Sequence, residues 1–178
     1  MKCPNGLNKT VLVSFPRSGH HLLVRGLTEA ANHRIVYAEM YNSAHNMNNC
    51  DFVNLQKSHD FDLTDPIDPE LNYIVLIRGF ELAVESWFRE SGASDLELFR
   101  QSKTEYFDGF MAKWVNDHSV TNRIVISYHD MVDAKMNTVV KAAHSMGFVP
   151  DIDKLRRWEH SEKVKYTNYA TPPAANIY

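Results

Sequence analysis

The segment from Pro16 to His21 reads PRSGHH and is the first part of this sequence whose residue types and order indicate binding chemistry. It follows an apolar run and opens an amphipathic helical pattern at about 18–31. The first backbone N–H groups of a helix have no intrahelical acceptor and bind phosphate or sulfate well. Arg17 adds a positive charge, and Gly19 lets a ligand approach the backbone closely. The turn therefore predicts a site for a tetrahedral anion; the equally weighted alternative is a helix cap at Ser18 beside a solvated arginine.

A second pair of residues indicates another anion contact. The apolar run YIVLIR ends at Arg78, and Ser86 follows eight residues later inside a helical pattern at about 80–90. An arginine at the C-terminal end of a parallel strand lies on the edge of the sheet where ligands bind. A serine on the next helix can reach the same anion. The two motifs together predict two anion contacts along one edge of a sheet.

Short runs rich in β-branched residues alternate with helical patterns along the chain. The predicted strands are 10–15, 34–38, 52–57, 73–78 and 123–127, and the predicted helices are about 18–31, 80–90, 96–118 and 133–146. This order predicts a three-layer α/β fold with a central, mostly parallel sheet of four to five strands flanked by helices. We expect one domain over residues 1–178, with an irregular tail from about 167 to 178.

Composition and charge exclude several classes of function. Hydrophobic residues make up 44% and charged residues 23% of the 178 residues, and no apolar run approaches the ~20 residues that insert into a membrane. Two cysteines make no disulfide framework, and the start of the chain lacks the apolar core of a signal peptide, so we expect a cytoplasmic protein. The net charge of −3 argues against a nucleic-acid surface. The expected partner is a small molecule or a glycan.

Histidines are numerous but do not form a metal-binding pattern. The nine histidines are scattered, and no HExxH or CxxC pair occurs. Adjacent His20 and His21 are expected to point to different faces of a helix and therefore not to chelate one ion together. No metal cofactor is expected.

Both anion motifs resemble segments of the sulfotransferase family. VSFPRSGHHLL is similar to the family's 5′-phosphosulfate loop, P-[KR]-[ST]-G-T-T, and YIVLIRGFELAVES is similar to its 3′-phosphate segment. Lys57-Ser58-His59 resembles the Lys-Thr-His of cytosolic members, and VISYHDMV at 125–132 resembles a strand ending in Tyr-Glu-Asp-Met. The resemblance covers roughly residues 8–150. It implies a fold related to the P-loop NTPases and the donor 3′-phosphoadenosine 5′-phosphosulfate (PAPS), which becomes adenosine 3′,5′-bisphosphate (PAP).

The resemblance also implies roles for individual residues. Arg17 would stabilise the leaving phosphate electrostatically, because arginine does not readily give up a proton. His59, beside Lys57, is the first candidate for the general base, and Glu39 is the second. The residues implied to bind the nucleotide are Pro16, Arg17, Ser18, Gly19, His20, His21, Arg78, Ser86 and Tyr128.

This sequence departs from the family pattern in two places. The usual Thr-Thr after the glycine is His20-His21, and the glycine-rich Arg-Lys-Gly lid over the 3′-phosphate is not visible. The remaining lid candidates are Arg156, Arg157, Lys163 and Lys165, with Trp158 as a possible stacking or packing aromatic. A smaller lid means a more open cofactor site, a second subunit that completes the site, or a large acceptor that covers it. We hypothesise the last two, and the second subunit would make the protein a homo-oligomer.

Two functions of other classes stay open. A nucleotide kinase or hydrolase of related fold is disfavoured because the lysine of GxxxxGK[ST] is missing. A non-catalytic module that binds nucleotides or anions is the other. The aromatic residues between 87 and 114 are expected to be mostly core, with some able to line a hydrophobic acceptor pocket.

Overall fold

The computed structural model describes residues 3, 6–31, 34–39 and 53–169, with side chains as far as residue 161. Five parallel strands form one sheet in the order β2-β3-β1-β4-β5. The strands are β1 Thr10–Ser14, β2 Tyr37–Glu39, β3 Leu55–Ser58, β4 Asn72–Ile77 and β5 Arg123–Ser127. The predicted fold class, an α/β protein with a central parallel sheet between helices, is confirmed.

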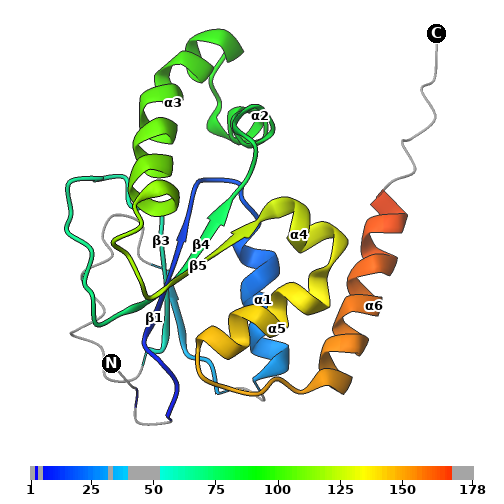
Figure 1. Ribbon diagram of the computed structural model, residues 1–178. Helices are drawn as coiled ribbons and strands as arrows, with labels where there is room; N and C mark the ends of the chain where they lie inside the picture. The colour runs from blue at the N-terminus through cyan, green and yellow to red at the C-terminus, as the bar shows by residue number, and fades with distance from the viewer. Residues whose placement is uncertain (1–2, 4–5, 32–33, 40–52, 170–178) are drawn as a thin grey trace, which may run out of the picture.

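Helices cover both faces of this sheet, which makes three layers (Figure 1). The helices are α1 His20–Ala30, α2 Phe80–Ser91, α3 Leu96–Met111, the π-helical turn η2 Ala112–Asn116, α4 Tyr128–Asp133, α5 Lys135–Ser145 and α6 Ile152–Tyr169. Helices α1, α5 and α6 pack on one face, and α2, α3 and η2 pack on the other.

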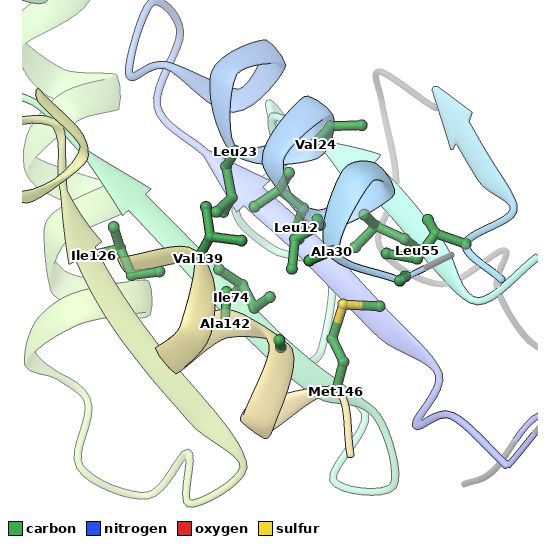
Figure 2. Close-up of a cluster of buried hydrophobic side chains, with 14 of the residues drawn as sticks. Leu12, Leu23, Val24, Ala30, Leu55, Ile74, Ile126, Val139, Ala142 and Met146 are labelled. Atoms are coloured by element: carbon green, nitrogen blue, oxygen red, sulfur yellow. The ribbon is translucent and has the colours of Figure 1, made fainter. Parts of the chain in front are cut away.

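Alternation along β1 explains why the strand reads as a continuous apolar run. Leu12 points into the cluster under α1 and α5, whereas Val11 and Val13 point into the cluster under α2 and α3. All five residues of β1 are buried because helices cover both sides. Figure 2 shows Leu12 meeting Leu23 of α1 and neighbouring side chains in the first cluster.

The observed elements differ from the predicted ones at the margins of the sheet. The strand predicted at 34–38 is observed as β2 at Tyr37–Glu39, an edge strand in which Tyr37 and Ala38 are partly buried and Glu39 is exposed. The helix predicted at 96–118 is an α-helix to Met111 and then turns into η2.

Helix α6 was not predicted, because in its described part only Leu155 and Trp158 are buried and the rest of the pattern is polar. It extends to Tyr169, so the first residues of the tail predicted to be irregular are helical. Residues 170–178 and the side chains of Lys163 and Lys165 lie outside the described residues.

Gly26 lets α1 pack closely against α5 and α6. A Cβ at this position would lie 2.6 Å from Val139 Cγ2 and 2.9 Å from the Trp158 ring. We expect Gly26→Val to lower the free energy of unfolding by about 1 to 3 kcal/mol, because the added methyl groups overpack the core. Urea denaturation measures this change. Gly79→Val is the matched control, since no atom lies within 4 Å of a Cβ built at Gly79, and an equal loss there would contradict the explanation.

Candidate active site

The C-terminal end of β1 is the point where the strand order reverses. The chain goes from β1 to β2 and β3 on one side and then crosses to β4 on the other side. In open α/β sheets this position forms a crevice in which ligands bind. Here a cleft of about 590 Å³ lies at that edge. The predicted site residues that line it are Pro16, Arg17, Gly19, His20, His21, Lys57, His59, Arg78, Ser86 and Tyr128.

The loop after β1 has an unusual backbone. Arg17 has a φ of 67°, in the left-handed region that non-glycine residues rarely adopt, and Gly19 has a φ of 89°. A Cβ on Gly19 would lie 2.9 Å from Cδ2 of Tyr128, so only glycine fits against that ring. With these backbone angles at Arg17 and Gly19, α1 begins at His20, and its first turn lines the cleft.

Ser18 does not cap this helix. The N-cap residue is Gly19, without a side-chain hydrogen bond. The Ser18 side chain is fully buried, and its hydroxyl has no hydrogen-bond partner among the residues that the structure describes. Ser18 is the one residue of the turn Pro16–His21 that does not line the cleft.

Arg78 is fixed in the cleft with one donor still unsatisfied. Its Nη1 donates to the backbone carbonyl of Arg17 at 3.2 Å, and its Cζ lies 4.2 Å from the centre of the Tyr128 ring. These contacts orient the guanidinium group. Its Nε is buried without a partner in the described part of the chain. A buried unsatisfied donor is costly, and the Arg78 guanidinium that carries it lines the cleft.

Arg17 reaches the second predicted anion motif. Its Nε donates to Ser86 Oγ at 3.1 Å, and its two terminal nitrogens lie 2.6 Å and 2.5 Å from the carboxylate oxygens of Glu90. Glu90 stands one helical turn after Ser86 on α2, so both side chains face the same guanidinium group. Arg17 and Arg78 thus share one cleft, and Arg17 is held there by a carboxylate.

An anion that binds Arg17 would have to displace or share the ion pair between Arg17 and Glu90. The pair is solvent-exposed, and such pairs contribute about 0.2 to 1 kcal/mol. If the cleft binds a nucleotide with two phosphates, such as PAP, we expect Glu90→Gln to tighten that binding by about two- to fivefold, which isothermal titration calorimetry measures. Glu85→Gln, on the same helix but outside the cleft, is the control. Unchanged or weaker binding in Glu90→Gln would contradict this competition.

His59 follows β3 and is oriented by the end of β1. Its Nδ1 lies 2.7 Å from the Ser14 carbonyl oxygen, which requires a hydrogen on Nδ1 and therefore puts the basic lone pair on Nε2. Burial lowers the pKa of His59 to about 4, although the hydrogen bond to Ser14 opposes this change. The imidazole is neutral at pH 7, as a general base must be.

Lys57, Glu39, His20 and His21 form a charged group beside His59. Glu39 lies 4.0 Å from Lys57 Nζ and 3.9 Å from His21 Nδ1. Burial lowers the pKa of the Lys57 ammonium, while Glu39 partly offsets this effect. Burial also lowers the pKa of His20 to about 3, and the nearby Lys57 charge adds to the change. Glu39 is thus the counter-ion of a buried lysine.

The expectation that His20 and His21 point apart is wrong. Their ring centres are 3.8 Å apart, and their ligand atoms lie within 4.8 Å of each other and of Glu39. Adjacent side chains of a helix diverge by about 100°, so the two imidazole rings at the start of α1 can still turn toward each other. Burial lowers the pKa of His21, Glu39 opposes this change, and the positive charges of Lys57, Arg25 and Arg17 add to it, so three cations and one carboxylate lie near these rings.

Six further residues line the cleft but were not assigned to it from the sequence. They are Leu22, Arg25, Phe61, Trp87, Glu90 and Ser91. Two of them could have been found from helical spacing. Arg25 stands four positions after His21, and Glu90 stands four positions after Ser86, so each lies on the same helix face as a predicted site residue. The Phe61 ring lies tilted beside the rings of His59 and Trp87, with ring centres 5.3 Å and 6.2 Å away. These rings form an apolar wall beside the candidate base.

The expected lid residues do not reach the cleft. Arg156 and Arg157 are exposed on α6, and neither lines the cleft between α1 and α2. Trp158 is 6% exposed and packs against Gly26, so it is a core residue and not a stacking platform for a ligand. Within the described residues, nothing from the C-terminal part beyond Tyr128 closes the site.

None of the described helices has both the length and the apolar character needed to cross a membrane. No protein-family model matches the sequence. No curated protein matches it either.

Two solved structures share the arrangement of strands and helices. Mouse sulfotransferase SULT7A1 complexed with PAP is 17% identical and matches with a TM-score of 0.64 over 96% of this chain and 70% of the mouse chain. A sulfotransferase from Alicyclobacillus acidocaldarius is 12% identical and matches with a TM-score of 0.50 over 89% of this chain and 92% of the other. The five-stranded parallel sheet and its flanking helices therefore have the fold of sulfotransferases.

Proposed function

We propose that this protein is a sulfotransferase that moves a sulfuryl group from PAPS to a hydroxyl or amine of a small molecule or glycan. The observation that carries the proposal is the cleft that Arg17, Arg78 and Ser86 share at the switch point of the sheet. A sulfotransferase fold and a neighbour complexed with PAP support it. The two motifs come from distant parts of the chain, yet they meet at one ligand-sized hollow.

The residues present fit a doubly anionic nucleotide. Arg78 Nε and His20 Nε2 are buried donor or acceptor atoms without hydrogen-bond partners among the described residues, and both residues line the cleft. The first amides of α1 add further donors. In this proposal Arg78 and Ser86 hold the 3′-phosphate, while Arg17 and the turn up to His21 hold the 5′-phosphosulfate.

When bound, PAPS supplies a sulfuryl group whose bond to the 5′-phosphate breaks as the acceptor bonds to sulfur. Arg17 stabilises the negative charge that grows on the departing phosphate. His20 and His21 stand where the family has hydroxyl donors, and their ring nitrogens orient the sulfuryl oxygens. The Lys57 ammonium adds positive charge from the floor of the cleft, where it is only 2% exposed.

His59 is the residue that takes the acceptor's proton in this proposal. Its Nε2 carries the basic lone pair, and its ring lines the cleft beside the apolar wall of Phe61 and Trp87. Glu39 ranks second, because it already neutralises Lys57 and is the more exposed of the two groups. Phe61 and Trp87 give the acceptor an apolar surface next to this base.

A nucleotide panel in a thermal-shift assay tests the proposal. We expect PAP at about one hundred times its Kd to raise Tm by roughly 5 to 10 °C without added magnesium. Stabilisation by ATP only in the presence of magnesium would contradict the proposal and favour a nucleotide kinase or hydrolase. Binding of PAP without transfer of labelled sulfuryl groups to a broad acceptor panel would contradict the catalytic half and favour a non-catalytic binding module.

A further inference from the structure

The residue directly after His59 is a fully buried aspartate. Asp60 is 0% exposed and has a φ of 49°, in the left-handed region that non-glycine residues rarely adopt. Its Oδ2 accepts a hydrogen bond from Trp114 Nε1 at 2.6 Å and lies 2.8 Å from Lys113 Nζ. An unpaired charge in this position would cost several kcal/mol. Lys113 and Trp114 therefore hold the Asp60 side chain, and with it the strained backbone of this residue, in place.

Both partners come from η2, the π-helical turn. Neighbouring residues of a regular α-helix point about 100° apart, yet Lys113 and Trp114 reach the same carboxylate. Interruptions of this kind occur often at functional sites. Lys113 Nζ also donates to the Asp65 carbonyl oxygen at 2.6 Å, which ties down the segment that follows Asp60. The π-helical turn thus fixes the loop between β3 and β4 at two points.

His59 lies between this anchor and the sheet. The Tyr106 hydroxyl donates to the His59 carbonyl oxygen, and the imidazole Nδ1 donates to Ser14 at the end of β1. Asp60 holds the next residue along the chain. The position of the imidazole is thereby fixed by the contact of its ring with Ser14 and by the contacts of the backbone at His59 and Asp60.

We propose that Asp60, paired with Lys113 and Trp114, is a positioning residue that holds His59 buried and aimed into the cleft. The inference rests on the proposed function only in taking His59 as the base. The titratable groups that face the imidazole are His20 and His21 from α1, Lys57 from β3 and Glu39 from β2. Asp60 and Lys113 are not among them, and they pair with each other at 2.8 Å. The anchor therefore acts on His59 through position and hydration.

The titration of the His59 imidazole, followed by NMR, tests this role without an acceptor. Its resonance is identified by its loss in His59→Asn. We expect Asp60→Asn and Lys113→Met to move its pKa from about 4 toward the ordinary value of 6.5, because a loosened loop lets water reach the ring. Asp62→Asn, an exposed change two residues along the same loop, should leave the pKa in place.

Activity gives a second readout on the same variants. We expect kcat to fall roughly 10- to 100-fold in Asp60→Asn, with KM and the Kd of PAP within about twofold of wild type. Lys113→Arg keeps the positive charge, so the His59 pKa and the transfer rate of this variant should stay close to those of the wild type. A general loss of structure would lower nucleotide binding as well, so the split between kcat and Kd separates positioning from folding.

Single neutralisations leave one buried charge unpaired and can prevent folding. The double variant Asp60→Asn/Lys113→Met removes both charges, and Trp114→Phe leaves the ion pair intact while removing the indole donor. A His59 pKa that stays near 4 in every variant that melts cooperatively would overturn the proposal. If the protein does not transfer sulfuryl groups, the His59 pKa can still shift in these variants. Failure of the proposed function can therefore be told apart from failure of the proposed positioning role.

Discussion

Arg78→Ala should weaken the binding of PAP by about 1.5 to 3 kcal/mol, which is roughly a 10- to 150-fold increase in Kd. The reason is that the charged guanidinium group of Arg78 lines the cleft, and its buried Nε has no hydrogen-bond partner among the described residues. It is also held in place by the Arg17 carbonyl and the Tyr128 ring, so little conformational entropy is lost when an anion binds. Isothermal titration calorimetry measures the change.

Arg89→Ala is the matched control for this measurement. Arg89 lies on α2, is exposed, and does not line the cleft. Its removal subtracts the same net charge from the protein, so any long-range electrostatic effect on a dianionic ligand appears in both variants. Equal weakening in the two variants would mean that Arg78 makes no direct contact with the nucleotide.

His59→Asn should reduce the rate of sulfuryl transfer by about 10² to 10⁴-fold while leaving the Kd of PAP nearly unchanged. Asparagine can still donate to the Ser14 carbonyl oxygen in place of Nδ1, but it has no basic nitrogen to accept a proton. Single-turnover transfer from labelled PAPS to the best acceptor of the panel measures the rate. His118→Asn, which changes an exposed histidine before β5, should have no effect.

The pH dependence follows from the same residue. The pKa of His59 is lowered to about 4, so the neutral, proton-accepting imidazole predominates at every pH above that value. We expect the transfer rate to stay level as the pH falls from 7 to about 5 and to decline only as the pH approaches 4. A decline centred near 6.5 would show a base in an ordinary aqueous environment. A retained rate in His59→Asn together with loss in Glu39→Gln would assign the base to Glu39 instead.

The central strands could be predicted from the sequence because burial on both faces gives a continuous apolar run. Val11, Leu12 and Val13 are all fully buried, and this pattern is distinct from that of a surface strand. The edge strand β2 has no such pattern, because its residues are partly exposed, and its predicted start was three residues too early. Helix α6 shows only two buried positions in its described part, which is too weak a periodicity to recognise.

The membership of the cleft was largely predictable, because loops after parallel strands converge at one edge of a sheet. The contacts within it were not. The pair of Arg17 with Glu90 joins residues 73 positions apart, and the bond from Trp114 to Asp60 spans 54 positions. Such pairs depend on how α2 and η2 pack over the sheet. The π-helical turn itself has no signal in residue spacing, because its residues continue the pattern of α3.

The central claim is that one nucleotide engages both arginines of the cleft through two separate phosphates. Competition calorimetry with PAP, adenosine 5′-monophosphate and adenosine 3′-monophosphate tests it most directly. We predict that each monophosphate binds at least about tenfold more weakly than PAP, and that Arg78→Ala weakens the 3′-phosphate ligands while sparing adenosine 5′-monophosphate. Adenosine 5′-monophosphate that binds as tightly as PAP, with no change in Arg78→Ala, would contradict the claim.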